Sequence, residues 1–374
     1  RDRSVSRGLG DVYKRQVFAL CACGNTTTTP EDKTPAAEES AAPAGNGDSA
    51  AASSPTTTDE AKAAGRKILV MNQHNSKEST NGQFTQYFVD YVNNNSDTLW
   101  IDVYYNGELG GIQETLEGAI MGTIDIGGCS FAQLATFYPE MEVWSMPYLY
   151  TDPYEGAKIV DLEKNTLLAE MIDKCNEVSG MTIFALNYSI DARQLTCNFP
   201  VYSPADLKGA KIRCITNPVY TMCIEGMGGT PIPIDWTETI SALTTGTVVG
   251  QENPYATLAS YQMWDCQKYV METNHMFDFA ANYICTDTWN GLTDAEKQVL
   301  RDGIAAQQQF QNETLETNKE EYKKLLVDNG MTIITAEDGL DVDAFKAGVD
   351  ALKEKNYPQY AEYFDYIADY LANY

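Results

Sequence analysis

Basic residues are scarce in this sequence of 374 residues, which has 26 lysines and arginines against 53 aspartates and glutamates. The formal net charge is -27, and from residue 67 onward 18 basic residues stand against 44 acidic ones. The acidity therefore belongs to the part of the chain that we expect to fold. A surface of this charge repels nucleic acid and is poorly suited to anionic lipid, so we exclude nucleic acid as a partner.

Long apolar runs and groups of metal ligands are also missing. No stretch after residue 66 approaches the roughly 18 apolar residues of a membrane span. The only histidines are His74 and His275, and the seven cysteines after residue 100 are dispersed without a CxxC pair. We therefore predict neither a metal nor a cofactor, and we expect these cysteines to serve as small buried apolar residues.

Signatures of catalysis are thin. The sequence has no GxSxG, no Walker-type loop and no GxGxxG with an acidic partner, and "GMGG" at 226–229 is typical of a helix stop. His275 lacks a credible nucleophile, which favours a structural role. Asp235 and Glu238 resemble a glycosidase acid pair, but one polar helical turn explains them equally well. We therefore expect a protein that is not an enzyme.

The N-terminal region resembles the end of an export signal followed by a linker. Residues 1–16 lack an initiating Met and resemble translated sequencing-adapter sequence, and "VFALCAC" resembles the end of a truncated signal peptide. Leu20 to Cys23 resemble a lipobox in which Cys23 would carry the lipid. Residues 24–65 contain little besides Ala, Ser, Thr, Pro, Gly and acids, so we expect a disordered tether behind the segment 1–23.

The body alternates between strand and helix patterns. "KILVM" (67–71) and "LWIDVYY" (99–105) have strand character, and Phe84, Phe88 and Val92 recur at helical spacing between them. Further strands and helices follow in the same rhythm, and strong helix formers fill residues 292–329. This pattern predicts an α/β fold with parallel-rich sheets, and the length favours two lobes.

Arginine is restricted to three positions after residue 66, whereas the other fifteen cations are lysines. Arg301 lies on a charged helix, where we expect a surface ion pair. Arg193 follows a strand, and Arg213 lies within the strand-like "KIRCI". A buried guanidinium needs a partner, and a planar fork suits a carboxylate. These residues alone leave open whether that partner is a ligand or an internal Asp or Glu.

Two further polar or aromatic residues follow the same region. Trp236 could stack on a ligand or pack in the core, and Asn253 ends a predicted strand just before Pro254. Side chains at the carboxyl ends of strands in open α/β sheets commonly face a ligand crevice. Both residues are candidates for a binding site, and a packing role for Trp236 and a turn role for Asn253 stay open.

The order of motifs resembles the solute-binding proteins of tripartite ATP-independent periplasmic (TRAP) transporters, the dicarboxylate-binding DctP-like family. The resemblance covers roughly residues 67–335. It rests on "NGELGGIQETLEGAIMGTIDIG", "FYPEMEVWSMPYLY", "ARQL", "SPADLKGAKIRC", "MGGTPIPIDWTETISALTTGTVVGQENP" and "TNH". The family commonly has Asp where this chain has Val249, which leaves Asn253 in register.

The resemblance implies roles for single residues. Arg213 would hold the carboxylate of an organic anion, with Arg193 as a second contact, Asn253 completing the clamp and Trp236 covering the ligand. The remaining candidates for the pocket wall are Tyr220, Gln73, His74 and Ser130.

The resemblance also implies a fold and partners. We expect a type II-like periplasmic-binding-protein fold with hinge strands and a long helix spanning two lobes. Lobe I would comprise 66–188 and 280–318, and lobe II 189–279 and 319–374. The protein would be a lipid-anchored extracytoplasmic monomer that captures a C4-dicarboxylate, keto acid or sugar acid and delivers it to the membrane permease subunits. An extracellular enzyme acting on an acidic sugar and a ligand-sensing receptor are the alternatives.

Overall fold

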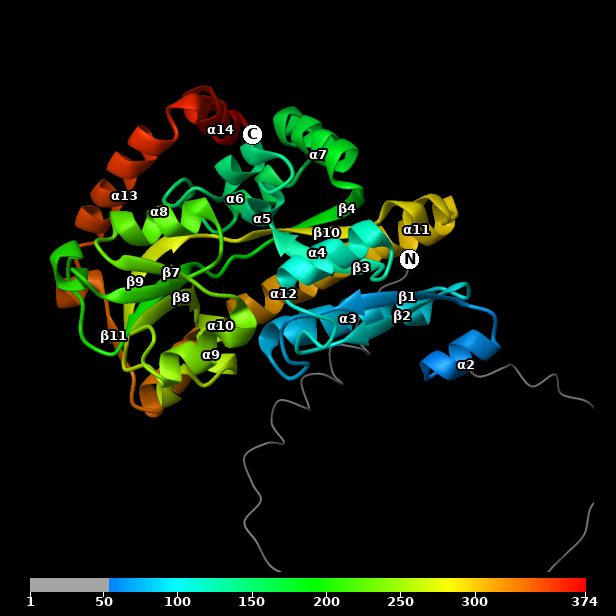
Figure 1. Ribbon diagram of the computed structural model, residues 1–374, viewed down its shortest axis with the longest axis horizontal. Coiled ribbons are helices and arrows are strands. Elements are labelled where there is room, and N and C mark those ends of the chain that lie inside the picture. The colour runs from blue at the N-terminus through cyan, green and yellow to red at the C-terminus, as the bar shows by residue number, and fades with distance from the viewer. Residues whose placement is uncertain (1–53) are drawn as a thin grey trace, which may run out of the picture. The chain divides into compact units, whose positions relative to one another are not determined.

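The computed structural model describes residues 54–374, which form two β-sheets covered by helices (Figure 1). The predictions for the adapter-like start, for Cys23 and for the tether up to residue 53 lie outside the described residues. The predicted tether extends to residue 65, whereas residues Thr58–Ala63 form helix α2. This part of the prediction is wrong because Thr57 caps the helix and Ala61 is fully buried.

The first sheet has the strand order β2-β1-β3-β10-β4. Strand β1 runs parallel to β2 and β3, and β10 runs antiparallel to β3 and β4. The predicted βαβαβ unit is present, with α3 between β1 and β2 and α4 between β2 and β3. The Ser79 hydroxyl caps the start of α3 by accepting the Gly82 N–H at 3.1 Å. The bounds are β1 Lys67–Asn72, α3 Thr80–Asn95, β2 Leu99–Tyr104, α4 Ile112–Met121, β3 Ile126–Ser130, β4 Met181–Tyr188 and β10 Phe279–Cys285.

The second sheet has the order β11-β9-β5-β8-β6-β7 and mixes parallel and antiparallel pairs. Strand β5 is antiparallel to β8 and β9, while β6 is parallel to β7 and β8. The bounds are β5 Arg193–Cys197, β6 Lys211–Cys214, α8 Pro218–Gly226, β7 Thr230–Pro233, α9 Trp236–Thr244, β8 Gly250–Pro254, α10 Tyr255–Ser260, β9 Tyr269–Met276, β11 Thr332–Ile334 and α13 Val342–Asn356.

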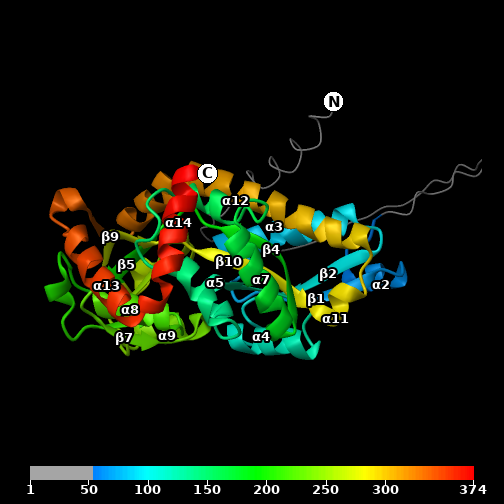
Figure 2. The same ribbon diagram turned by 90° about the horizontal axis from the view of Figure 1, so that it is seen from above.

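The chain crosses between the two sheets in three places. Residues 189–192 join β4 to β5, residues 277–278 join β9 to β10, and helix α12 (Asp294–Asp328) packs on α3 and β4 as well as on α10 and β11. Figure 2 shows α12 running alongside elements of both sheets. The prediction of one long helix at 292–329 is confirmed, and Thr293 and Glu296 form a capping box at its start. The predicted lobe boundaries stay a prediction.

The remaining helical elements lie between strands along the chain or follow β11 at its C-terminal end. Helix α14 (Ala361–Asn373) lies beside α6, and the Tyr370 hydroxyl donates to the Lys158 carbonyl at 2.7 Å. The predicted aromatic stripe of this helix is a packing face, because Tyr363, Phe364 and Tyr370 pack against the core around the buried Ile367. The other helical elements are α5 Phe131–Leu134, η1 Pro139–Ser145, α6 Glu155–Ile159, α7 Thr166–Ser179, η2 Pro204–Leu207, η3 Met263–Asp265, α11 Thr286–Asn290, η4 Ala336–Asp338 and η5 Pro358–Tyr360.

The seven cysteines of the body are free thiols, and all but Cys266 are buried. This agrees with the predicted packing role, and burial raises the pKa of the Cys175 thiol to about 11. Within residues 54–374, no helix combines the length and apolar character needed to span a bilayer.

Candidate functional site

A cavity of about 310 Å³ lies between the two sheets. Its walls include Asn72 from β1 and Asn282 from β10 on one side, and Arg193 from β5 and Asn253 from β8 on the other. The volume is in the lower part of the range for small-molecule sites. This cavity is the place where strand ends from both sheets meet.

Six of the eight predicted site residues line this cavity, whereas Arg213 and Tyr220 do not. The six are Gln73, His74, Ser130, Arg193, Trp236 and Asn253. Both remaining residues contact members of the wall. The Arg213 Cζ atom lies 5.7 Å from the ring centroid of Trp236, and the Arg193 Cζ atom lies 5.5 Å from that of Tyr220.

Arg213 is a buried cation without an acidic partner among residues 54–374. Its side chain is 2% exposed, and its Nε–H donates to the Ile234 carbonyl at 2.9 Å. Nη1 is buried and has no hydrogen-bond partner. Burial lowers the pKa of Arg213 to about 10, so the guanidinium stays charged at neutral pH. A buried charged group without a hydrogen-bond partner is costly, so an acceptor for Nη1 would stabilise the guanidinium of Arg213.

Arg193, by contrast, is held by internal carboxylates. It forms an ion pair with Glu252 through Nε, and Nη2 donates to Glu252 Oε1 at 2.9 Å. Nη1 donates to Asp278 Oδ2 at 2.7 Å, and Nη2 also reaches Asn253 Oδ1 at 3.0 Å. Counting its five N–H donors leaves one proton of Nη1 for a ligand. The charge of Arg193 is therefore already compensated.

The acids beside Arg193 form a buried network with Tyr220 and His275. The Tyr220 hydroxyl donates to Asp278 Oδ1 at 3.1 Å, and His275 Nε2 lies 3.3 Å from Glu252 Oε2. Burial alone would raise the pKa of Glu252, but the charge and hydrogen bonds of Arg193, together with His275, lower it to about 2. Burial raises the pKa of Tyr220, so its hydroxyl stays protonated as a donor.

Trp236 and Asn253 sit at the ends of elements of the second sheet. Trp236 is the first residue of α9, and its ring contacts Tyr261 edge-on with centroids 4.7 Å apart. The Asn253 amide donates to Gln251 Oε1 at 2.5 Å while its carbonyl accepts from Arg193. Asn253 thus has one amide proton that no neighbour uses within the described residues.

The candidates from the first sheet are partly engaged by their neighbours. Gln73 donates to Thr85 and accepts the Asn75 N–H at 3.0 Å. His74 Nε2 lies 3.0 Å from Thr115 Oγ1, and burial lowers the pKa of His74, which keeps the ring neutral. Ser130 caps α5 as part of a capping box. These side chains shape the wall through bonds that fix their orientation.

Sequence reasoning missed Glu252, Asp278 and Asp191. Glu252 precedes Asn253 within "QENP", and Asp278 follows "TNHMF", so each lay next to a motif that was recognised. Asp191 is 9% exposed and accepts the Ala256 N–H at 2.9 Å, and burial raises its pKa to about 6. For Glu252 and Asp278 the available signal was the expected internal partner of Arg193, for which the sequence analysis named no residue.

The site holds no sign of the glycosidase pair. Asp235 caps α9 by accepting the Thr237 N–H at 3.0 Å, and Glu238 is exposed on the same helix. Neither residue lines the cavity. Residues 54–374 also contain no cluster of three or more His, Cys, Asp or Glu side chains that could hold a metal ion.

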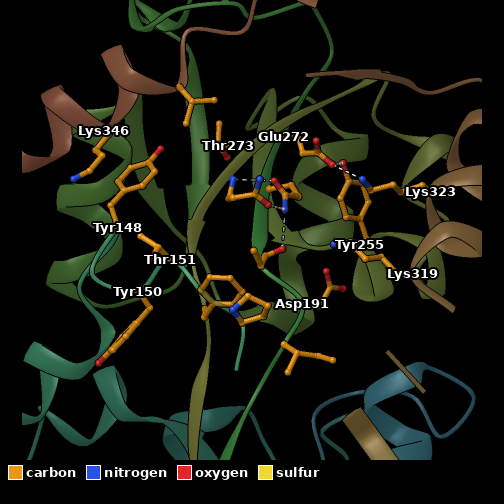
Figure 3. A pocket seen from close by; sticks show the side chains of 17 residues that line it. Tyr148, Tyr150, Thr151, Asp191, Tyr255, Glu272, Thr273, Lys319, Lys323 and Lys346 are labelled. Carbon is orange, nitrogen blue, oxygen red and sulfur yellow. Dashed lines mark hydrogen bonds and ion pairs between the residues drawn. The ribbon is translucent and has the colours of Figure 1, made fainter. Parts of the chain in front are cut away.

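A second cavity, of about 460 Å³, is lined by both connections between the sheets and by α12 and α13 (Figure 3). Lys323 forms an ion pair with Glu272, and Lys346 lies 2.6 Å from Asp350 Oδ2. Asp191 lines this cavity as well as the first one. The cations here are thus largely paired with acids, unlike Arg213.

The sequence of this chain is similar to those of known solute-binding proteins. Residues 71–359 match the family of bacterial extracellular solute-binding proteins, family 7. The ectoine-binding periplasmic protein TeaA of Halomonas elongata is 26% identical over 274 residues, which is 73% of this chain and 79% of that protein. The 2,3-diketo-L-gulonate-binding periplasmic protein YiaO of Escherichia coli is 26% identical over 66% of this chain and 73% of its own.

Solved structures match the fold. A TRAP periplasmic solute-binding protein of Actinobacillus succinogenes, solved with bound L-galactonate, superposes with a TM-score of 0.76 at 22% identity. The match covers 82% of this chain and all of the other. The expectation of a two-lobed α/β fold of the periplasmic-binding-protein kind is therefore confirmed.

Proposed function

We propose, on the premise that this chain belongs to the bacterial extracellular solute-binding proteins of family 7, that it captures a small organic carboxylate in the 310 Å³ cavity. The family consists of binding proteins for TRAP transporters and not of enzymes. The named relatives bind solutes in the periplasm, and the name of YiaO specifies a sugar acid. Delivery to the membrane permease subunits of a TRAP transporter would follow capture.

The observation that carries the proposal is the unpartnered Nη1 of Arg213. A ligand carboxylate would supply the acceptor that this buried cation lacks, in a charge-assisted hydrogen bond. Because Trp236 lines the cavity and its ring centroid lies 5.7 Å from Arg213 Cζ, we propose that its ring shifts when the carboxylate reaches Nη1. The ring then covers the bound solute.

Three further residues would complete the clamp. Arg193 offers its remaining Nη1 proton, Asn253 offers its free amide proton, and Tyr220 positions Arg193 through Asp278. Gln73, His74 and Ser130 would bind the rest of the solute from the first sheet. Charge-assisted bonds strengthen as closure removes water from the cavity.

Thermal unfolding against a panel of organic acids tests this function. A ligand at about 100 times its dissociation constant adds about 2.7 kcal/mol to the free energy of unfolding, which raises the transition temperature. We expect at least one carboxylate to produce such a shift and the matching alcohol to produce none. A panel of C4-dicarboxylates, keto acids and sugar acids without any shift would contradict the proposal.

We further propose that the protein acts as a monomer tethered through a lipid on Cys23. The lipobox-like residues Leu20 to Cys23 support the anchor. The polar segment that follows would link the lipid at the membrane to the folded body. Expression with the native leader should place the protein in the membrane fraction, and Cys23→Ser should release it. A wild-type protein that stays in the soluble fraction would refute the anchor, and light scattering at twice the chain mass would refute the monomer.

A further inference from the structure

The charges around the cavity are unbalanced in a way that restricts the ligand. One guanidinium, Arg193, and two carboxylates, Asp191 and Asp278, line the cavity, whereas Arg213 and Glu252 lie outside its wall. Arg193 is engaged by both Glu252 and Asp278, so it offers little net positive charge. Arg213 forms no ion pair among the described residues, although Glu252 and Asp235 act on its charge, and its Nη1 has no hydrogen-bond partner.

A second negative charge on the solute would find no such partner. Asp191 and Asp278 both line the cavity, and no lysine does. Burial raises the pKa of Asp191 to about 6 against the charges of Lys319 and Lys323 in the second cavity, so the carboxyl group carries negative charge at pH 7. His74 cannot compensate, since burial holds it neutral. Repulsion in a site of low dielectric is strong, so a dianion is disfavoured there.

The uncharged part of the wall is rich in side-chain amides. Ten of the 31 lining residues are Asn or Gln, namely Asn72, Gln73, Asn75, Asn81, Gln133, Asn187, Asn253, Asn282, Gln307 and Gln311. Asn282 donates its amide to Asn187, which leaves its carbonyl oxygen available, while Gln133 uses its carbonyl for Ser130 and keeps its amide free. The wall therefore offers both free amide donors and free carbonyl acceptors, which hydroxyl groups can pair with.

We infer that the cavity selects a polyhydroxylated monocarboxylate, a sugar acid with a single negative charge, over dicarboxylates of the same length. The inference rests on the proposed function, because Arg213 must hold the carboxylate. The single carboxylate pairs with Arg213, and the amides bind the hydroxyl groups. Specificity against a dianion comes from Asp191 and Asp278, which a second carboxylate would approach.

Calorimetry with six-carbon aldonates, aldarates and a polyol, and with succinate and ectoine as further probes, tests the inference on the full chain. The probes are gluconate, galactonate and gulonate, the dicarboxylates glucarate and galactarate, the polyol glucitol, succinate, and the zwitterion ectoine. We expect at least one aldonate to bind tenfold or more tightly than either aldarate and than succinate, with no binding of glucitol. Tighter binding of a dicarboxylate or of ectoine would overturn the inference while leaving the proposed function in place. Binding of no carboxylate at all would instead overturn the proposed function.

A charge substitution provides a second readout. Asp191→Asn keeps an oxygen for the Ala256 N–H but removes the negative charge. It should raise aldarate affinity relative to aldonate affinity at least threefold at pH 7. Asp97→Asn, on the exposed turn before β2, is the matched control and should leave the ratio unchanged. An unchanged ratio in Asp191→Asn would show that Asp191 does not exclude the second charge.

Discussion

The Arg213 guanidinium lies 5.7 Å from the centroid of the Trp236 ring, and its Nη1 has no hydrogen-bond partner. Arg193, on another strand of the same sheet, has Glu252 and Asp278 as partners. Of these two buried arginines in one sheet, Arg193 is thus held in ion pairs and Arg213 is not.

The two arginines should affect the stability of the unliganded protein in opposite ways. Arg193→Met leaves Glu252 and Asp278 without their cation, so the free energy of unfolding should fall by about 3–5 kcal/mol. Arg213→Met removes an uncompensated charge, and the free energy should rise or change by less than about 1 kcal/mol. Urea unfolding of both variants measures this. A loss in Arg213→Met as large as that in Arg193→Met would reveal an internal ion pair.

Stability at low pH should depend on Glu252. Its pKa is about 2 in the fold against an ordinary 4.5, so the folded state binds fewer protons between these values. The contribution is complete above about pH 4.5 and is lost as the pH falls toward 2. Unfolding of Glu252→Gln and wild type at several pH values should show a gap that narrows over this window. Glu362→Gln, on the exposed face of α14, is the control, and a pH-independent gap for Glu252→Gln would contradict the assignment.

Ligand binding should change the fluorescence of Trp236. The Trp236 ring lines the cavity and lies close to the Arg213 guanidinium. A carboxylate that approaches Arg213 therefore alters the surroundings of the ring. A saturating aldonate should change the intrinsic emission of wild type and of Trp264→Phe, which alters a tryptophan that does not line the cavity. Trp236→Phe should abolish the change while retaining measurable binding by calorimetry. A full emission change in Trp236→Phe would place the ligand elsewhere.

Much of the fold follows from local patterns. The apolar run "KILVM", the helical spacing of Phe84 and Phe88, and the helix formers of 292–329 all give elements close to the predicted ranges. Tertiary contacts decide the exceptions. Thr58–Ala63 is helical because Trp100 Nε1 donates to the Thr58 hydroxyl at 3.1 Å and Ala61 is buried, and the polar composition of this segment carries no trace of that packing.

The site was predictable as a set of residues but not as a network. Six candidates line one cavity because their motifs fall at strand ends, which the alternation of strands and helices locates. The partner of each arginine depends on register between distant strands, such as the pairing of Leu195 with Glu252. The ion pair expected for Arg301 is wrong for the described residues, since its Cζ lies 5.1 Å from the Trp289 ring centroid instead. The sequence contains many acidic residues, and only the fold shows which of them pair with Arg193.

Calorimetric titration of Arg213→Lys with the tightest organic acid tests the central claim most directly. Lysine keeps the positive charge but loses the planar fork and the Nη1 donor, so the dissociation constant should rise tenfold or more, about 1.4 kcal/mol per decade. Arg301→Lys, on α12, should leave it unchanged. An unaltered dissociation constant in Arg213→Lys would contradict the assignment of Arg213 as the carboxylate-binding residue.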